Sequence, residues 1–251
     1  MRPLSAAELI DVWEQGMTLP PLQQSLLLLS VACPEMTTDA LAQASIGHRD
    51  TLLLQLRAWT FGPQLDSVVD CPVCSERLEF ALDSSEILAS ESETPQTPKA
   101  IDADGLRILV RPPDSLDLAA IDQEADPAAA RSALIARCIV DIQPLPENKE
   151  EVGSPLSPKA LPESTINIVL QQLGELDPQA DIHLNLMCPT CGHDWQAIFD
   201  IATYFWQEID DWAQRTLRDV HTLAMAYSWS EADILSMSAW RRQAYLQMVT
   251  G

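Results

Sequence analysis

The length, composition and charge of the chain exclude several classes of protein. Its 251 residues, 47% of them hydrophobic, are enough for one large domain or two modest ones with real cores. The 15 Lys and Arg residues are outnumbered by 37 Asp and Glu, and the resulting net charge of −22 repels nucleic-acid phosphates and anionic membranes. We therefore expect neither a nucleic-acid nor a membrane partner, whereas a basic protein surface would be attracted.

The beginning of the chain and its apolar runs predict a cytoplasmic location. Residues 1–20 interleave acidic with apolar side chains, which is unlike a signal peptide. The longest strongly apolar run, Leu26 to Cys33, is far shorter than the roughly 20 residues of a membrane-spanning helix. In a reducing cytoplasm, paired cysteines are more often metal ligands or redox groups than disulfides.

Residues 1–64 are expected to form an N-terminal helical region of three short helices. The pattern Ser5-x-x-Glu8 is a capping box and predicts the first helix start. Two prolines at 20–21 lead into a second apolar helix, and a third is expected over residues 47–60. The side chains of the third helix that we expect in the core are Leu52, Leu53, Leu56 and Trp59.

Two short arms, residues 65–82 and 181–199, alternate apolar and polar residues around a Cys-x-x-Cys pair. The pairs are CPVC and CPTC, and apolar residues follow the second cysteine of each at four, six and eight residues. Such alternation is typical of half-buried strands, so each arm predicts a strand–knuckle–strand hairpin. The apolar positions are Leu65, Val69, Leu78, Phe80 and Leu82 in the first arm and Ile182, Leu184, Leu186, Trp195, Ala197 and Phe199 in the second.

The region between the arms, residues 83–180, is expected to be an insertion with two linkers. Residues 91–100 are polar and contain proline, and residues 143–162 carry five prolines with few large apolar groups. Between the linkers, residues 108–111 predict a short strand and residues 134–140 the end of a helix.

Residues 200–251 are expected to form a C-terminal helical region. Asp200 is a plausible N-cap of a long helix that ends near Tyr227. Ser230 begins a short helix and Ser238 caps a last one, which runs through residue 249. The residues expected on the buried face of the long helix are Ile201, Phe205, Ile209, Trp212, Val220, Leu223 and Tyr227.

Together these elements predict an α+β fold. It is mostly helical, with a small antiparallel zinc-ribbon sheet formed by two CPxC knuckles that are distant in sequence.

The four cysteines of the arms, Cys71, Cys74, Cys188 and Cys191, are expected to bind one structural zinc ion. Two knuckles supply four thiolates, the tetrahedral ligand set that structural zinc prefers, and a closed set leaves no position for catalytic water. The 113 residues between Cys74 and Cys188 exceed the spacing of a standard ribbon. The longer loop costs only about 1.6 kcal/mol, whereas zinc binding contributes roughly 10–16 kcal/mol.

Other interpretations of these cysteines remain open. A redox pair usually opens a helix, whereas strands follow both pairs here; disulfides need an oxidising compartment, and iron–sulfur clusters use the same ligands. His193 is a possible substitute ligand but is expected to be an exposed knuckle residue. Gly192 suits a positive φ better than its counterpart Ser75. Cys33 and Cys138 occupy helical, apolar settings and are expected in the core.

The sequence contains no motif of a known catalytic site. A Gly-rich phosphate loop, G-x-S-x-G and H-E-x-x-H are all absent, so we expect no enzymatic activity and no catalytic residues. The carboxylates Glu208, Asp210 and Asp211 are expected on the solvated face of the long helix. The histidines, expected to be structural or solvated, are His48, His183, His193 and His221.

Three blocks of the sequence resemble a known family. They are IGHRDTLLLQLRAWTFGP at residues 46–63, the following CPVCSERLEF, and residues 180–249, in which the turn Tyr227-x-Trp229-Ser230-Glu231-Ala232 and the pair Arg241-Arg242 are the most specific. The pattern resembles the baseplate hub assembly chaperone family of T-even-type tailed phages, in its branch associated with contractile injection systems and phage-like tail clusters. Nothing familiar is found in residues 83–105 and 143–160.

The resemblance implies a cytoplasmic accessory chaperone or adaptor for the baseplate or hub of a contractile tail-like particle. Its partners would be baseplate, hub or spike proteins, and it would carry no catalytic residues. A permanent structural baseplate component is the alternative, and a zinc-ribbon regulatory protein is less favoured because of the net charge. The aromatic segments that we expect either at a partner surface or in the core are Trp206, Trp212 and residues 229–249. The resemblance transfers no ligand residues, so the zinc assignment depends on the cysteine pattern alone.

Overall fold

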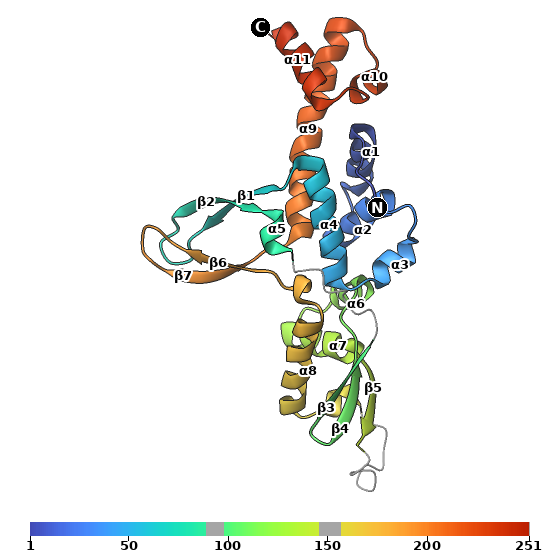
Figure 1. Ribbon diagram of the computed structural model, residues 1–251, viewed down its shortest axis with the longest axis vertical. Helices are drawn as coiled ribbons and strands as arrows, with labels where there is room; N and C mark the ends of the chain where they lie inside the picture. Colours follow the sequence, from blue (N-terminus) through green and yellow to red (C-terminus); the bar gives the residue numbers. More distant parts are fainter. Residues whose placement is uncertain (89–97, 146–156, 251) are drawn as a thin grey trace. The chain divides into compact units, whose positions relative to one another are not determined.

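The computed structural model describes residues 1–88, 98–145 and 157–250. It is mostly helical with small antiparallel sheets, as the predicted α+β class requires (Figure 1). The chain divides into two compact units. Unit 1 comprises Met1–Thr38, Gln55–Gly62 and Asp200–Gly251, and unit 2 comprises Asp39–Leu54 and Pro63–Phe199.

Unit 1 is built from helices at the two ends of the chain. Ser5 forms the predicted capping box with Glu8, and Asp200 accepts hydrogen bonds from the first turn of the long helix, so both predicted starts are confirmed. Ser230 forms a further capping box, and the Ser238 hydroxyl accepts from the amide of Arg241. The helices are α1 (Ala6–Gly16), α2 (Pro21–Ala32), the later turns of α4 (Ile46–Phe61), α9 (Ile201–Tyr227), α10 (Glu231–Leu235) and α11 (Ala239–Thr250).

The long helix α9 provides the main buried face of unit 1 and packs against α1, α2, α10 and α11. The prediction was wrong for Trp212 and Tyr227, which are only half-buried. Only glycine fits at position 16, because a Cβ there would lie 2.1 Å from the ring of Trp206. The residues of α9 that are buried are Ile201, Phe205, Ile209, Ala213, Thr216, Val220 and Leu223.

Two of the three carboxylates predicted to be solvated on α9 have protein partners instead. Glu208 pairs with Arg57, and Asp210 accepts a hydrogen bond of 2.8 Å from the indole nitrogen of Trp13. Of the three, Asp211 alone is exposed. On α4, Trp59 is 45% exposed rather than in the core.

Unit 2 contains a three-stranded sheet, two separate hairpins and several helices. Its elements, beside the first turns of α4, are α3 (Thr38–Gln43), β1 (Gln64–Asp70), β2 (Arg77–Asp83), α5 (Ser84–Ile87), β3 (Lys99–Ala103), β4 (Leu106–Val110), α6 (Ser115–Ile121), α7 (Pro127–Cys138), β5 (Ile139–Pro144), the short 3-10 turns η2 (Pro158–Ala160) and η3 (Pro178–Ala180), α8 (Glu163–Leu176), β6 (His183–Met187) and β7 (Asp194–Ile198).

The three-stranded sheet has the order β3-β4-β5, with both pairs antiparallel. Helix α8 and the turns around it complete a core with this sheet, because apolar side chains from both gather there. The members of this core are Leu106, Ile108, Val110, Ile135, Ile139, Leu161, Val169 and Leu176.

The observed structure differs from the predicted insertion at three boundaries. Lys99 and Ala100 begin β3 and are not linker, although residues 89–97 lie outside the described residues. The helix expected over 134–140 ends at Cys138, and Val140 lies in β5. Of the second predicted linker, residues 146–156 lie outside the described part, while Leu161 is buried in the core.

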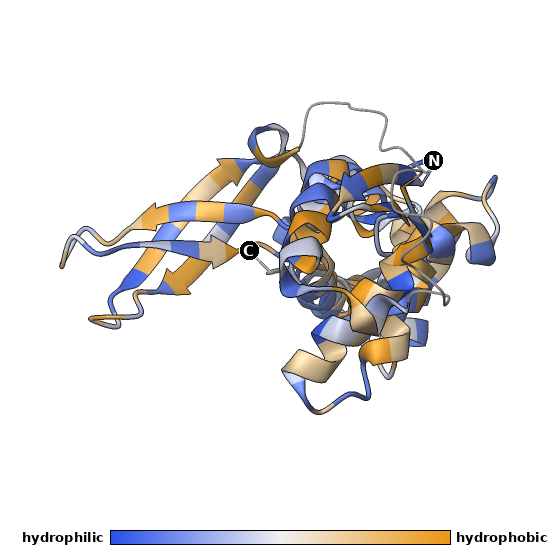
Figure 2. Ribbon diagram, turned by 90° about the horizontal axis from the view of Figure 1, so that it is seen from below, coloured by the Kyte–Doolittle hydropathy of each residue, from blue (hydrophilic) through white to orange (hydrophobic). Residues whose placement is uncertain are grey.

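The two predicted arms are antiparallel hairpins, β1–β2 and β6–β7, which run beside each other (Figure 1, Figure 2). They are separate two-stranded sheets among the described residues, so the expected single ribbon sheet is two hairpins instead. The predicted alternation is present in each, and Figure 2 shows apolar and polar residues alternating along the strands.

No helix in the described part of the chain is long and apolar enough to span a membrane.

Candidate metal centre

The two Cys-x-x-Cys turns have the same backbone hydrogen bonds. In the first, the amide of Cys71 donates to the carbonyl of Glu76 and the amide of Ser75 donates to the carbonyl of Cys71, at 2.8 and 2.9 Å. In the second, Cys188 donates to His193 and Gly192 donates to Cys188, both at 2.9 Å. Each turn therefore closes the end of its hairpin with the same geometry.

A residue with a left-handed backbone conformation follows the second cysteine of each pair. Gly192 has φ +71°, as expected, and Ser75 has φ +58° at the equivalent position. This conformation is unfavourable for a residue with a Cβ, so the first knuckle bears a strain that the second avoids.

The four thiols converge on one point between the hairpins. The Sγ atoms of Cys71 and Cys191 are 3.7 Å apart, and those of Cys74 and Cys188 are 3.6 Å apart. All four sulfurs lie within 4.8 Å of one another, close enough to hold a single metal ion. The pairs cross from one hairpin to the other, so a shared ion would join segments that are 114 and 120 residues apart in sequence.

These distances separate a metal centre from a disulfide site. A sulfur–sulfur bond is about 2.0 Å long, well below the observed separations, and all six cysteines of the chain are free. Cys33 and Cys138 are buried, with 0% and 1% exposure, as predicted for core residues.

The four thiols do not favour ionisation equally. Burial opposes the Cys71 thiolate, but backbone amides of Cys74 and Val73 outweigh it and lower the pKa of this thiol to about 6. The backbone of Glu76 favours the Cys74 thiolate, yet burial and the neighbouring sulfurs raise its pKa to about 12. Four thiolates this close together repel one another unless a cation lies among them.

His193 takes a different place from the one expected. It is half-buried rather than exposed, and its ring stacks on Trp195 with centroids 6.0 Å apart. The contribution of His193 to the knuckle is its backbone carbonyl, which accepts the hydrogen bond from Cys188.

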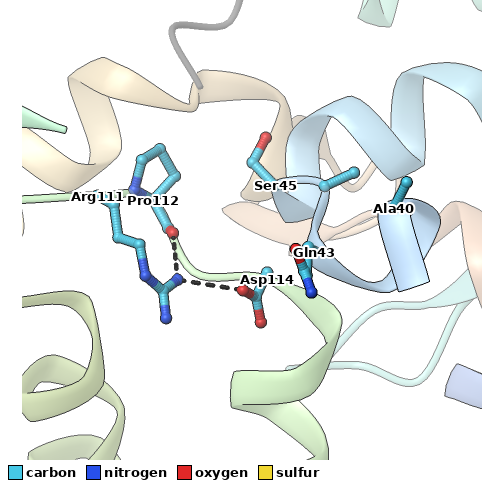
Figure 3. A pocket seen from close by; sticks show the side chains of 7 residues that line it. Ala40, Gln43, Ser45, Arg111, Pro112 and Asp114 are labelled. Carbon is cyan, nitrogen blue, oxygen red and sulfur yellow. Dashed lines mark hydrogen bonds and ion pairs between the residues drawn. The ribbon is translucent and has the colours of Figure 1, made fainter. Parts of the chain in front are cut away.

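A pocket elsewhere in unit 2 lies between α3, the start of α4 and the segment before α6 (Figure 3). Arg111 points into it, but the guanidinium is already bound to the carbonyl of Pro112 and to the carboxylates of Asp114 and Asp117. The positive charge is thereby neutralised, so the pocket offers no free cation to a ligand. Its lining residues are Ala40, Gln43, Ala44, Ser45, Arg111, Pro112 and Asp114.

The structure is that of a mostly helical protein with two cysteine-bearing hairpins. Comparison with known families identifies the class of protein to which it belongs. The model of the family described as T4 bacteriophage base plate protein matches residues 27–206, which is 180 of the 251 residues and includes all four knuckle cysteines. The chain belongs to this family of phage baseplate proteins. This membership supports a structural or assembly role in the baseplate and contact with other baseplate components. No curated protein and no solved structure matches the chain.

Proposed function

We propose that this protein is an accessory chaperone or adaptor for assembly of the baseplate or hub of a contractile tail-like particle. The observation that carries the proposal is the family match over residues 27–206. The resemblance of residues 46–63 and 180–249 to hub assembly chaperones supports the finer assignment. Hub or spike proteins are the proposed clients.

The charge of the chain suits such a role. A net charge of −22 keeps the protein soluble and opposes its own aggregation, while it attracts basic surfaces of unassembled partners. The proposed role requires no catalysis, in agreement with the expectation that the chain is not an enzyme.

Deletion of the gene tests this function directly. We expect few or no complete particles by electron microscopy, and restored assembly when the gene is supplied in trans. Unchanged particle number and unchanged sheath contraction in the deletion strain would refute the proposal.

A permanent baseplate component is the second candidate, favoured by the description of the family itself. The two roles differ in what the finished particle contains. Quantitative mass spectrometry of purified particles should find the chain absent or far below one copy per symmetry-related position if it is a chaperone. Stoichiometric copies would assign it to the finished baseplate.

We further propose that Cys71, Cys74, Cys188 and Cys191 hold one structural zinc ion. A tetrahedral ion with zinc–sulfur bonds of about 2.3 Å places its sulfurs about 3.8 Å apart, and the two closest sulfur pairs measure 3.6 and 3.7 Å. Four thiolates and no exchangeable water make the site structural, so its role is to fasten hairpin β1–β2 to hairpin β6–β7.

Metal analysis of the purified protein distinguishes zinc from the alternatives. We expect about one zinc per chain and, after exchange, the intense visible absorption of tetrahedral cobalt bound by four thiolates. Iron and acid-labile sulfide would indicate an iron–sulfur cluster, and a metal-free protein with four titratable thiols would indicate redox cysteines.

A further inference from the structure

Each short sulfur contact of the metal centre joins a buried thiol to an exposed one. Cys71 is 2% exposed, and its Sγ atom lies 3.7 Å from that of the exposed Cys191. Cys188 is 1% exposed, and its Sγ atom lies 3.6 Å from that of the exposed Cys74. The four thiols thus form two equivalent pairs, and each pair has one sulfur that solvent reaches and one that is shielded.

This arrangement favours oxidation that ends at a disulfide. A small oxidant reaches an exposed sulfur first and converts it to a sulfenic acid. The sulfenic acid condenses with a neighbouring thiol or, where none is within reach, is oxidised further and irreversibly. For Cys74 the thiol within reach is that of Cys188, and for Cys191 it is that of Cys71. No thiol of the site is left over when both pairs have reacted.

The four sulfurs also provide a link between the hairpins that strand pairing does not. Among the described residues, β1–β2 and β6–β7 are separate two-stranded sheets. Both short sulfur contacts run from one hairpin to the other. The bonds that the sulfurs make therefore decide whether this link is kept.

We propose that hydrogen peroxide converts the metal centre into two disulfides that keep the hairpins fastened after the zinc is released. The disulfides are Cys71–Cys191 and Cys74–Cys188. This conversion rests on the proposed zinc site and adds to it an oxidised state, in which the protein retains the cross-link without the metal.

Two equivalents of peroxide complete the conversion. In each pair the exposed thiolate attacks one peroxide oxygen, the O–O bond breaks, and the departing hydroxide takes up a proton to become water. The buried thiolate then attacks the sulfenic sulfur, which forms the S–S bond and expels a second hydroxide that also becomes water. In sum, four thiolates, two peroxides and four protons give two disulfides and four water molecules. The sulfurs are oxidised and the peroxide oxygens reduced; because a disulfide has no thiolate to offer, the zinc ion is released with its charge unchanged.

Two other pairings of the four thiols lead to different products. Disulfides within each knuckle, Cys71–Cys74 and Cys188–Cys191, would leave the hairpins unlinked. Pairing Cys71 with Cys188 would join the two buried thiols, so the exposed sulfurs that react first would lack a shielded partner. The proposed pairing follows existing contacts, each of which has to shorten by roughly 1.6–1.7 Å to reach the S–S bond length of about 2.0 Å.

Zinc release and thiol loss, followed together, test the conversion. The zinc content of the purified, reductant-free chain is measured, and peroxide is added in the presence of a chromogenic zinc chelator, with a peroxide-free sample as control. One zinc should appear for every four thiols lost, and of the six cysteines only the buried Cys33 and Cys138 should still react with a thiol reagent in denaturant. Zinc that stays bound while the thiols resist peroxide would overturn the conversion and leave the zinc site standing. A reduced chain without zinc would refute the site itself.

Trypsin distinguishes pairing across the hairpins from pairing within them, because each knuckle lies in one peptide. Cleavage after Arg57 and Arg77 gives residues 58–77, and the second knuckle falls in residues 160–215. Mass spectrometry of the oxidised chain should find these two peptides joined, and reduction should separate them. Two separate peptides, each with an internal disulfide, would overturn the proposed pairing.

Cys74→Ser tests the assignment of individual partners. The substitution leaves Cys188 without its partner, so peroxide should form Cys71–Cys191 alone, and the two peptides should still be joined. The thiol that remains in the second knuckle, alkylated after denaturation, should be that of Cys188. Circular dichroism checks the fold of the variant. Separate peptides, or alkylation at Cys191, would refute the assignment.

Thermal unfolding tests whether the disulfides hold the hairpins. Chelation of the reduced chain removes both the ion and the link, whereas peroxide removes the ion and keeps the link. The oxidised chain should therefore unfold at a higher temperature than the reduced, chelated chain, and a reductant added with the chelator should abolish the difference. An oxidised chain no more stable than the chelated one would overturn the proposal that the disulfides keep the hairpins fastened.

Discussion

Arg57 on α4 and Glu208 on α9 form a two-pronged ion pair within unit 1. The guanidinium is 3% exposed and donates to the two carboxylate oxygens at 2.6 and 2.8 Å. A third hydrogen bond goes to the carbonyl of Gly62, and the ring of Tyr204 lies 5.7 Å from the guanidinium carbon. Because Arg57 is almost fully buried, its charge depends on Glu208 for compensation.

Glu208→Ala should therefore destabilise the protein by about 2–4 kcal/mol, because it leaves a buried guanidinium without its carboxylate. Chemical denaturation measures the effect. Asp211→Ala, an exposed carboxylate on the same helix, is the matched control and should change stability by less than about 0.5 kcal/mol. Equal effects of the two substitutions would show that the pair contributes nothing beyond helix surface charge.

Cys188→Ser should lower the unfolding temperature and abolish its dependence on chelator. The substitution leaves three thiolates, so the proposed ion would be bound weakly, and the two hairpins would lose their cross-link. Thermal unfolding is measured with and without a chelator. Cys33→Ala removes a buried thiol outside the cluster and should preserve the chelator effect of the parent. A parent protein with the same unfolding temperature in both conditions would contradict a structural metal.

Local patterns predicted the parts of the fold that local physics determines. The start of α1 at Ser5, the start of α9 at Asp200 and both hairpins follow from capping residues and from period-two alternation. The convergence of the four cysteines could also be anticipated, because each knuckle supplies two thiols and two matching knuckles together supply the four ligands of one metal ion.

Tertiary packing determined the parts that were missed. Helix α8, Glu163–Leu176, follows a proline-rich segment and was not predicted, although it completes the core of the three-stranded sheet. The partners of Glu208 and Asp210 come from residues about 150 and 200 positions away, which no local pattern reveals. Gly47 likewise reads as an ordinary helix start, yet a Cβ there would lie 2.0 Å from the buried carboxylate of Asp177.

Gly192→Ala and Ser75→Gly should have opposite effects on the knuckles. Both residues have positive φ, and no heavy atom lies within 4 Å of the Cβ position at Gly192, so backbone strain alone decides its substitution. Gly192→Ala should cost about 1 kcal/mol, whereas Ser75→Gly relieves strain and should be neutral or stabilising by up to about 1 kcal/mol. Denaturant unfolding of the metal-loaded protein measures both. The reverse order of stability would contradict the positive φ values.

Asp117→Asn should remove part of the acid sensitivity of unit 2. Asp117 is fully buried and accepts hydrogen bonds from Arg111 and Arg137 at 2.6–3.0 Å. Burial opposes its charge, but the hydrogen bonds from Arg111, the Asp114 amide and Arg137 outweigh it, so the pKa of this carboxyl is held below its ordinary value.

A carboxyl whose pKa is lower in the folded than in the unfolded state stabilises the protein at pH values above its unfolded pKa of about 3.9. This stabilisation is lost as the pH falls towards and through the lower pKa of the folded state. The parent should therefore be clearly more stable than Asp117→Asn at pH 7, and the difference should shrink progressively from about pH 5 downwards. Urea unfolding at a series of pH values measures the difference. Asp122→Asn, an exposed position at the end of the same helix, should differ little from the parent at any pH. A stability difference for Asp117→Asn that stays constant down to pH 3 would mean that the ionised form of Asp117 is not what holds Arg111 and Arg137.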